Sequence, residues 1–119
     1  MRDFRKLKVW EKSHQWALNI YRVTSSFPSD ERFTLMTQLR RSAASIPTNI
    51  AEGCGTESSK ELSRFLRIAA ASASEAEYQI LLACDLGYLK EKTYLDLNAN
   101  IREIKKMLNS FIGALKPDS

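Results

Sequence analysis

Residues 39–53 read LRRSAASIPTNIAEG and set a paired arginine and a proline inside a helical hydrophobic pattern. The apolar positions recur at spacings of three and four on both sides of the proline: Met36, Leu39, Ala43, Ile46 and Ile50. Pro47 lacks an amide hydrogen and clashes with the carbonyl four residues earlier, so it either kinks or splits the helix. The unchanged phase of the stripe favours a kink. We expect Gly53 and Gly55 to end this helix in the left-handed cap conformation.

An amphipathic helix is predicted before this segment, over residues 7–25. Its apolar arc contains Val9, Trp10, Ser13, Trp16, Ala17, Ile20, Tyr21 and Val23, with Leu18 as the one apolar exception on the polar side. Phe27-Pro28 ends the helix, because proline disfavours helical backbone at the preceding residue. Ser29 is then placed to cap the second helix, which we expect over residues 30–53.

Two further helices are predicted after the glycines. Ser58 and Glu61 have the spacing of a capping box, so the third helix covers about 59–87 with Gly87 as its C-terminal cap. The fourth, about 91–115, has uninterrupted three-four spacing: Tyr94, Leu97, Ile101, Ile104, Leu108, Phe111 and Leu115. Short connections indicate an all-α, antiparallel up-down-up-down four-helix bundle with a proline-kinked second helix, forming one domain over 1–119. Residues 116–119 are expected to fray.

The third helix contains an alanine and serine tract at residues 69–74. Small residues on every side allow close approach by more than one neighbour, and a single bundle needs only one inward face. One hypothesis is that the other side packs against a second subunit. The alternative is that alanine simply favours the helix on an exposed face.

Composition and charge restrict the class of protein. The chain has 119 residues with 44% hydrophobic and 27% charged residues, typical of a globular domain, and no apolar run long enough to span a membrane. We expect a cytoplasmic protein whose two cysteines are free thiols. The formal net charge of +4 permits an anionic partner, and the basic excess is concentrated in the N-terminal half.

Seven segments spread over almost the whole chain are informative together: LKVW at 7–10, FP at 27–28, QLRRSA at 38–43, SIPTNIAEG at 45–53, FLRIA at 65–69, SEAE at 74–77 and LGY at 86–88. With these segments the chain resembles a bacterial family, the 23S rRNA intervening-sequence proteins. The resemblance implies a four-helix bundle, often assembled as a pentamer. It also implies a relation to the accessory variability proteins of diversity-generating retroelements, which work with a reverse transcriptase and with nucleic acid. It implies no established reaction. The chain departs from the family at one expected glycine in the third helix, where it has Ala70 or Ala71.

Basic residues are the candidate binding residues. Guanidinium groups suit phosphate oxygens, so Arg40 and Arg41 are candidate RNA or DNA contacts, and a cluster and a ridge extend them: Arg5, Lys6 and Lys8, then Lys60, Arg64 and Arg67. Repeated around an oligomer, such patches bind a polyanion through avidity. The alternative is that Arg40 and Arg41 pair with acids such as Glu52, Glu75 or Glu77 and hold the kinked turn together. The aromatic residues Trp10, Trp16, Tyr21, Phe65 and Phe111 fit core positions, so no base-stacking platform is predicted.

The sequence supports no catalytic, metal or cofactor site. Glu11 and His14 have the Glu-x-x-His spacing of carboxylate metal bundles, but His14 is the only histidine, so a second such pair is missing. Cys54, near the start of the third helix, is a possible reactive thiolate without a catalytic partner. We therefore expect a non-enzymatic, oligomeric accessory protein that binds nucleic acid; the alternative is a protein-binding adaptor with no affinity for nucleic acid.

Overall fold

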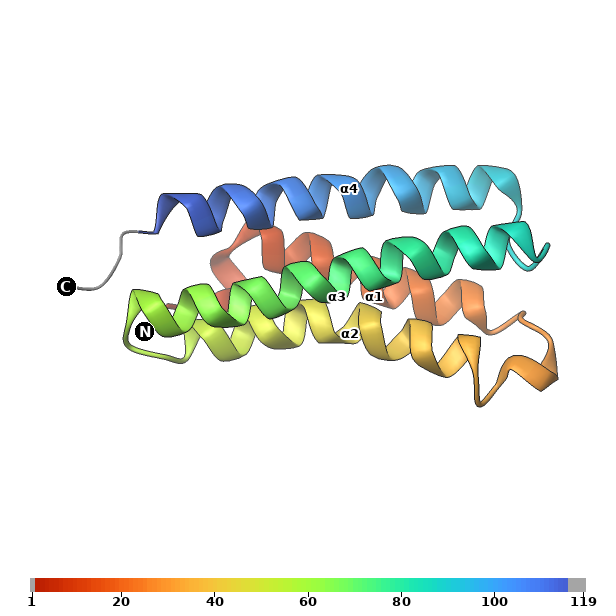
Figure 1. Ribbon diagram of the computed structural model, residues 1–119, viewed down its shortest axis with the longest axis horizontal. Helices are drawn as coiled ribbons and strands as arrows, with labels where there is room; N and C mark the ends of the chain where they lie inside the picture. Colours follow the sequence, from red (N-terminus) through yellow and green to blue (C-terminus); the bar gives the residue numbers. More distant parts are fainter. Residues whose placement is uncertain (1, 116–119) are drawn as a thin grey trace.

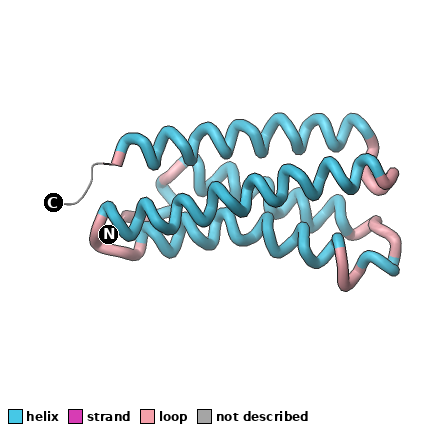
Figure 2. The backbone as a smooth tube through the Cα atoms, viewed as in Figure 1, coloured by secondary structure: helices cyan, strands magenta, loops and turns pink. Residues whose placement is uncertain are grey.

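The computed structural model describes residues 2–115, and four long helices make up most of them: α1 (Lys8–Thr24), α2 (Leu35–Cys54), α3 (Ser59–Asp85) and α4 (Glu91–Ala114). Two short 3₁₀ helices, Phe4–Lys6 and Ser29–Glu31, precede α1 and α2. Figure 1 shows consecutive helices running in opposite directions along one long axis, and Figure 2 shows how short the connections are. The predicted all-α four-helix bundle is confirmed. The fraying expected for 116–119 lies outside the described residues.

The four helices pack around one core in which each helix contacts two others. α2 contacts α1 and α3, and α4 also contacts α1 and α3, whereas the diagonal pairs α1–α3 and α2–α4 are not in contact within residues 2–115. The α2–α3 pair is the most extensive, because fully buried alanines line it: Ala43, Ala69, Ala73 and Ala76. Small side chains let two helix backbones approach closely. The α1–α4 pair has the fewest contacts, which leaves a cleft between these helices.

Pro47 lies inside α2, which continues from Leu35 to Cys54 without a break. The alternative of two separate helical pieces is therefore wrong, and the kink itself stays a prediction. Pro47 is buried and lines a groove between α1 and α2, so its ring packs toward α1. The predicted stripe is confirmed, since Leu39, Ala43, Ile46 and Ile50 are fully buried and Met36 is half-buried against the core.

The two glycines at the end of α2 do not have the expected left-handed conformation. Gly55 follows the last helical residue with φ −78°, and only Gly87 has a positive φ among the described residues. Gly53 is instead needed for space: a Cβ there would lie 2.9 Å from Leu62 Cδ1 and 3.0 Å from Phe65 Cβ. The glycine permits a close approach of α2 to α3.

The second helix begins at Leu35 rather than near Asp30. Ser29 starts a 3₁₀ turn and makes no capping bond, because the backbone turns again before α2. Glu31 takes the capping role. Its carboxylate accepts hydrogen bonds from the Thr34 hydroxyl and, at 3.3 Å, from the Leu35 amide. A carboxylate at this position also complements the positive end of the helix dipole.

The ends of α3 follow the sequence prediction closely. Ser58 Oγ accepts a hydrogen bond from the Glu61 amide at 3.0 Å, one half of the predicted capping box. At the other end, the Tyr88 amide donates to the Ala83 carbonyl and the Gly87 amide to the Cys84 carbonyl, both at 2.9 Å. With Gly87 at φ 82°, these bonds form a Schellman motif. No helix within residues 2–115 is long and apolar enough to cross a membrane.

Candidate nucleic-acid interface

The first basic cluster lies at the end of the bundle that contains the N-terminus and the α2–α3 connection, here called the N-terminal end (Figure 1). Arg5, Lys6 and Lys8 are exposed where the first 3₁₀ helix enters α1. Arg5 Nη1 lies 3.9 Å from Asp3 Oδ1, and the Arg5 guanidinium lies over the Phe4 ring, whereas the side chains of Lys6 and Lys8 make no ion pair or hydrogen bond within the described chain. Two fully solvated ammonium groups are therefore available to an anionic ligand.

The predicted ridge on α3 lies at the same end of the bundle but on a helix that does not contact α1. Lys60, Arg64 and Arg67 are exposed. Arg64 is partly engaged, because its Nε is 2.9 Å from Glu61 Oε2 and its guanidinium lies 4.4 Å from the centre of the Phe65 ring. Arg67 has no ion partner within residues 2–115. The cluster and the ridge thus share one end without forming a continuous patch.

Arg2 is a further cation at this end of the bundle, and sequence reasoning did not single it out as a binding residue. Its amide donates to the Cys54 carbonyl at 2.9 Å, and its guanidinium lies 5.7 Å from the centre of the Phe111 ring of α4. It also lines a small hollow with Ser58 and Ser59 at the start of α3. The chain therefore crosses the end of the bundle with an arginine exposed on it. No local sequence pattern predicts this position of Arg2, because its contacts depend on the tertiary fold.

Arg40 and Arg41 have different roles and lie in the other half of the bundle. Arg40 Nε donates to Thr24 Oγ1 at 2.8 Å, its terminal nitrogen donates to the Tyr21 carbonyl at 3.1 Å, and its guanidinium covers the Tyr21 ring. It therefore caps the last turn of α1. Arg41 is exposed and makes no ion pair in the described chain.

The partners suggested from the sequence for these arginines do not bind them. Within residues 2–115, neither Arg40 nor Arg41 forms an ion pair with Glu52, Glu75 or Glu77. Glu77 pairs instead with Lys105 of α4 at 2.7 Å. Only Arg41 of the pair remains available to a ligand.

The aromatic side chains are less uniformly buried than predicted. Trp16 is 2% exposed and donates from its indole nitrogen to the Leu97 carbonyl at 3.0 Å. Tyr21 is 46% exposed at the edge of the bundle, although the Arg40 guanidinium lies 4.9 Å from the centre of its ring. Tyr78 on α3 is 60% exposed and was not identified, although it follows Ala71 by two helical turns on the same face.

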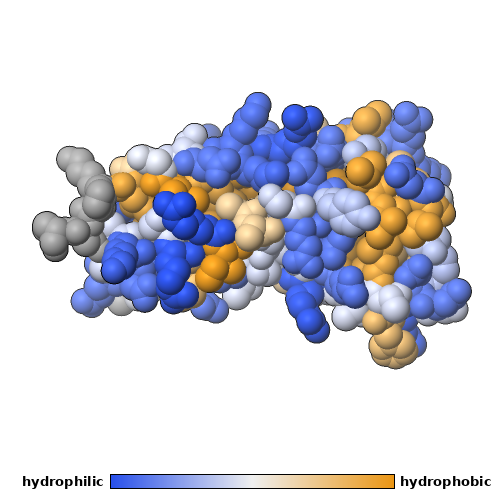
Figure 3. Space-filling view, viewed as in Figure 1, coloured by the Kyte–Doolittle hydropathy of each residue, from blue (hydrophilic) through white to orange (hydrophobic). Residues whose placement is uncertain are grey.

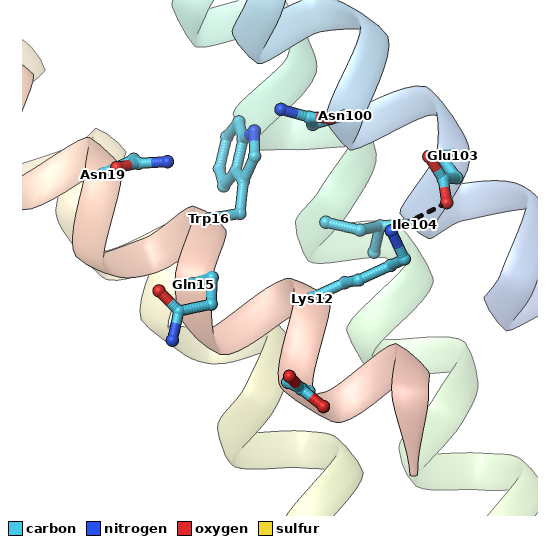
Figure 4. A pocket seen from close by; sticks show the side chains of 8 residues that line it. Lys12, Gln15, Trp16, Asn19, Asn100, Glu103 and Ile104 are labelled. Carbon is cyan, nitrogen blue, oxygen red and sulfur yellow. Dashed lines mark ion pairs between the residues drawn. The ribbon is translucent and has the colours of Figure 1, made fainter.

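A polar cleft of about 270 Å³ lies between α1 and α4, where helix contact is weakest (Figure 4). Lys12 reaches across it to Glu103, with 3.0 Å between the ammonium nitrogen and the carboxylate oxygen, and Trp16 forms its wall. Glu11 lines this cleft, whereas His14 lines the groove between α1 and α2. The two side chains of the Glu-x-x-His pattern therefore open into different hollows and do not form one site.

Cys54 is unsuited to nucleophilic chemistry. It is 1% exposed, and burial raises the pKa of its thiol, an effect that the nearby Arg2 only partly offsets. A raised pKa reduces the thiolate fraction near neutral pH. The reactive-thiolate alternative is therefore contradicted by the position of the side chain.

Comparison with known proteins agrees with the fold. A crystal structure of a protein of unknown function from the S23 ribosomal protein family of Bacteroides thetaiotaomicron VPI-5482 matches 89% of this chain and 96% of its own, with a TM-score of 0.82 and 30% identity. None of the curated proteins compared with the chain matches it. The family model described as 23S rRNA-intervening sequence protein matches residues 5–110. The chain belongs to the 23S rRNA-intervening sequence protein family.

Proposed function

We propose that this protein is a non-enzymatic, homo-oligomeric accessory protein that binds RNA or DNA through its N-terminal end. The cation excess of residues 2–8 at that end carries the proposal. Residues 2–8 contain Arg2, Arg5, Lys6 and Lys8 against the single acid Asp3, all exposed. Arg67 adds a side chain without an ion partner in the described chain, and Lys60 and Arg64 add charge on the same end of α3.

The expected binding mode is phosphate contact rather than base readout. Lysine and arginine neutralise phosphates and release condensed counterions, so affinity is sequence-tolerant and falls steeply with salt. A few cations per subunit bind weakly, whereas several subunits on one strand gain effective concentration. Oligomerisation therefore allows patches that bind a polyanion weakly in one subunit to bind it more tightly together. The family resemblance further suggests a pentamer in the cytoplasm and a partner such as a reverse transcriptase.

A protein-binding adaptor is the second candidate, favoured by large exposed apolar side chains. Phe33 is 84% exposed in the turn before α2, and Tyr78, Leu95 and Leu86 are 60%, 54% and 49% exposed. Exposed aromatic and leucine side chains are common anchors in protein interfaces. Under this function the protein has no affinity for nucleic acid.

Binding of single-stranded RNA and DNA to the full chain, measured over a salt series with the mass of the protein determined on the same sample, tests the proposal. We expect an oligomer that binds at micromolar or lower concentration at low salt, with log affinity falling linearly against log salt. A folded oligomer that fails to bind at low salt would overturn nucleic-acid binding and favour the adaptor. Stoichiometric iron or manganese in the purified protein would contradict the non-enzymatic assignment.

A further inference from the structure

The polar cleft between α1 and α4 lies midway between the N-terminal end and the distal end, which contains the α1–α2 and α3–α4 connections. Ordinary small-molecule sites have about 300–1,000 Å³, so a cleft of about 270 Å³ has room for a ligand as small as one nucleic-acid base. The buried side chains of Trp16 and Ile104 give it an apolar wall. Figure 4 shows Asn19 of α1 and Asn100 of α4 on either side of the Trp16 indole.

Hydrogen-bonding groups at the edges of the cleft are open to a ligand. Within residues 2–115, the side chains of Glu11 and Asn100 make no hydrogen bond or ion pair. The Lys12–Glu103 pair crosses the cleft, but both side chains are about half exposed, and such a pair contributes little stability and opens readily. Figure 3 shows hydrophilic surface over the middle of α4, at the top of the view. The cleft therefore favours a flat ligand with polar edges over an apolar protein segment.

Charge keeps phosphate out of the cleft and attracts it to the adjacent surface. The cleft has two carboxylates, Glu11 and Glu103, against the single ammonium group of Lys12. Lys8 lies one turn before Lys12 on the same face of α1, and its side chain has no partner in the described chain. From Lys8 to Trp16 the distance along α1 is about 12 Å, at 1.5 Å per residue. A strand with a phosphate on Lys8 therefore has a nearby base within reach of the cleft.

We propose that the α1–α4 cleft holds one unpaired base of the bound strand, and that this base carries an exocyclic amino group. The inference rests on the proposed function and adds one base contact to phosphate contacts that are themselves sequence-tolerant. An asparagine amide pairs with the edge of adenine, and a carboxylate accepts from the amino group of cytosine. Uracil and thymine have a carbonyl oxygen in place of that amino group, which the carboxylates of Glu11 and Glu103 repel. Bases of a single strand are free to enter such a site.

Binding of the full chain to single strands of one length, measured over a salt series, tests this contact. The probes are strands of adenine, cytosine or uracil and an abasic strand with the same backbone. We expect the adenine and cytosine strands to bind about tenfold more tightly than the uracil and abasic strands, as for one base-edge contact. The slope of log affinity against log salt should be equal for all four, because their phosphates are the same.

Two asparagine variants of α4 assign the base preference to the cleft. Asn100→Ala removes an amide that lines the cleft, and Asn109→Ala removes an exposed amide of the same helix that does not line it. We expect Asn100→Ala to lose the preference for adenine over uracil and to keep the salt slope, whereas Asn109→Ala should change neither. Both positions are exposed, and helicity by circular dichroism checks that both variants fold.

The outcomes separate this inference from the function on which it rests. A wild-type protein that binds none of the strands at low salt contradicts both. Equal affinity for the abasic and adenine strands overturns the base contact alone. A preference that is undiminished in Asn100→Ala overturns its placement in the cleft, and a uracil strand that binds as tightly as the cytosine strand overturns the requirement for an amino group.

Discussion

At the distal end of the bundle, side chains fasten the connections to one another, whereas at the N-terminal end close packing holds the helices and the charged groups remain on the surface. The Tyr88 hydroxyl donates to Glu31 Oε2 at 2.8 Å, which ties the α3–α4 connection to the start of α2. The Tyr88 ring lies 5.4 Å from that of Phe27, and Arg40 caps α1. At the N-terminal end, Gly53 lets α2 approach α3.

The two ends of the bundle also differ in the balance of acidic and basic residues. The distal connections, residues 22–32 and 85–92, contain equal numbers of both signs: Arg22, Arg32, Lys90 and Lys92 against Asp30, Glu31, Asp85 and Glu91. At the other end, residues 2–8 have four cations against Asp3, whereas residues 52–61 around the α2–α3 connection have Glu52, Glu57 and Glu61 against Lys60, so the cation excess belongs to the N-terminal segment. An excess of one sign raises the local concentration of an oppositely charged partner, and a balanced surface does not. Under the proposed function, the N-terminal end is the ligand-facing end, and the distal end has a structural role.

The largest expected effect breaks the packing of the N-terminal end. A methyl group at Gly53→Ala meets Leu62 and Phe65, so those side chains must shift. Overpacking outweighs the helix-propensity gain of alanine, and we expect the free energy of unfolding to fall by about 1–2 kcal/mol. Gly113→Ala is the control, because nothing lies within 4 Å of its new methyl group, and in the last turn of α4 it should raise stability by up to about 0.5 kcal/mol. Urea unfolding measures the change in the free energy of unfolding for both variants. Changes of the same sign in the two variants would contradict the close approach of α2 to α3.

The second prediction separates the two adjacent arginines. Arg40→Met keeps an apolar stem but removes the hydrogen bonds to the Thr24 hydroxyl and the Tyr21 carbonyl, so stability should fall by about 1–2 kcal/mol. Arg41→Ala should change stability by less than about 0.5 kcal/mol, because Arg41 has no partner in the described chain. Thermal unfolding of both variants decides this. A larger loss at Arg41 would show that the structural role is assigned to the wrong residue.

The smallest expected effect concerns the tie between the distal connections. Hydrogen bonds from Thr34, and then from Tyr88, hold the pKa of Glu31 below its ordinary value of 4.5. A lowered pKa in the folded state contributes stability above pH 4.5 that is lost as pH falls through the folded value. We expect Tyr88→Phe to be slightly less stable than the wild type at pH 7 and the gap to close below pH 4.5. A gap that does not change with pH would mean that the Glu31 carboxylate does not receive this bond.

Much of the fold follows from local patterns in the sequence. The three-four spacing of α2 and α4, the cap at Ser58 and the Gly87 turn were predictable, because each depends on residues within a few positions of one another. The start of α2 was not, since Glu31 caps it with help from Tyr88, 57 residues away. The role of Gly53 was not predictable either, because it depends on packing against α3 and not on neighbouring residues in the sequence. A glycine after a helix usually indicates a left-handed cap, and only the packing of α3 reveals a close approach.

The candidate interface was predictable in composition but not in arrangement. The basic residues are visible in the sequence, yet helical periodicity does not say that Arg40 covers Tyr21 while its neighbour faces solvent. Likewise, Arg2 reaches the α2–α3 connection only because the chain folds across the end of the bundle. Residue spacing predicts which side chains share one face of a single helix. Which charged side chains lie together in the folded chain depends on how the helices pack.

The most direct test of the account compares nucleic-acid binding by variants of the two ends. Lys6→Gln combined with Lys8→Gln removes two cations from the N-terminal end, and Lys90→Gln combined with Lys92→Gln removes two from the distal end. The slope of log affinity against log salt should fall in magnitude by about 1.4–1.8 for the N-terminal pair, at 0.7–0.9 for each lost phosphate contact, and stay unchanged for the distal pair. Equal changes in the two variants, or a larger one in the distal pair, would contradict the assignment of the N-terminal end as the ligand-facing end.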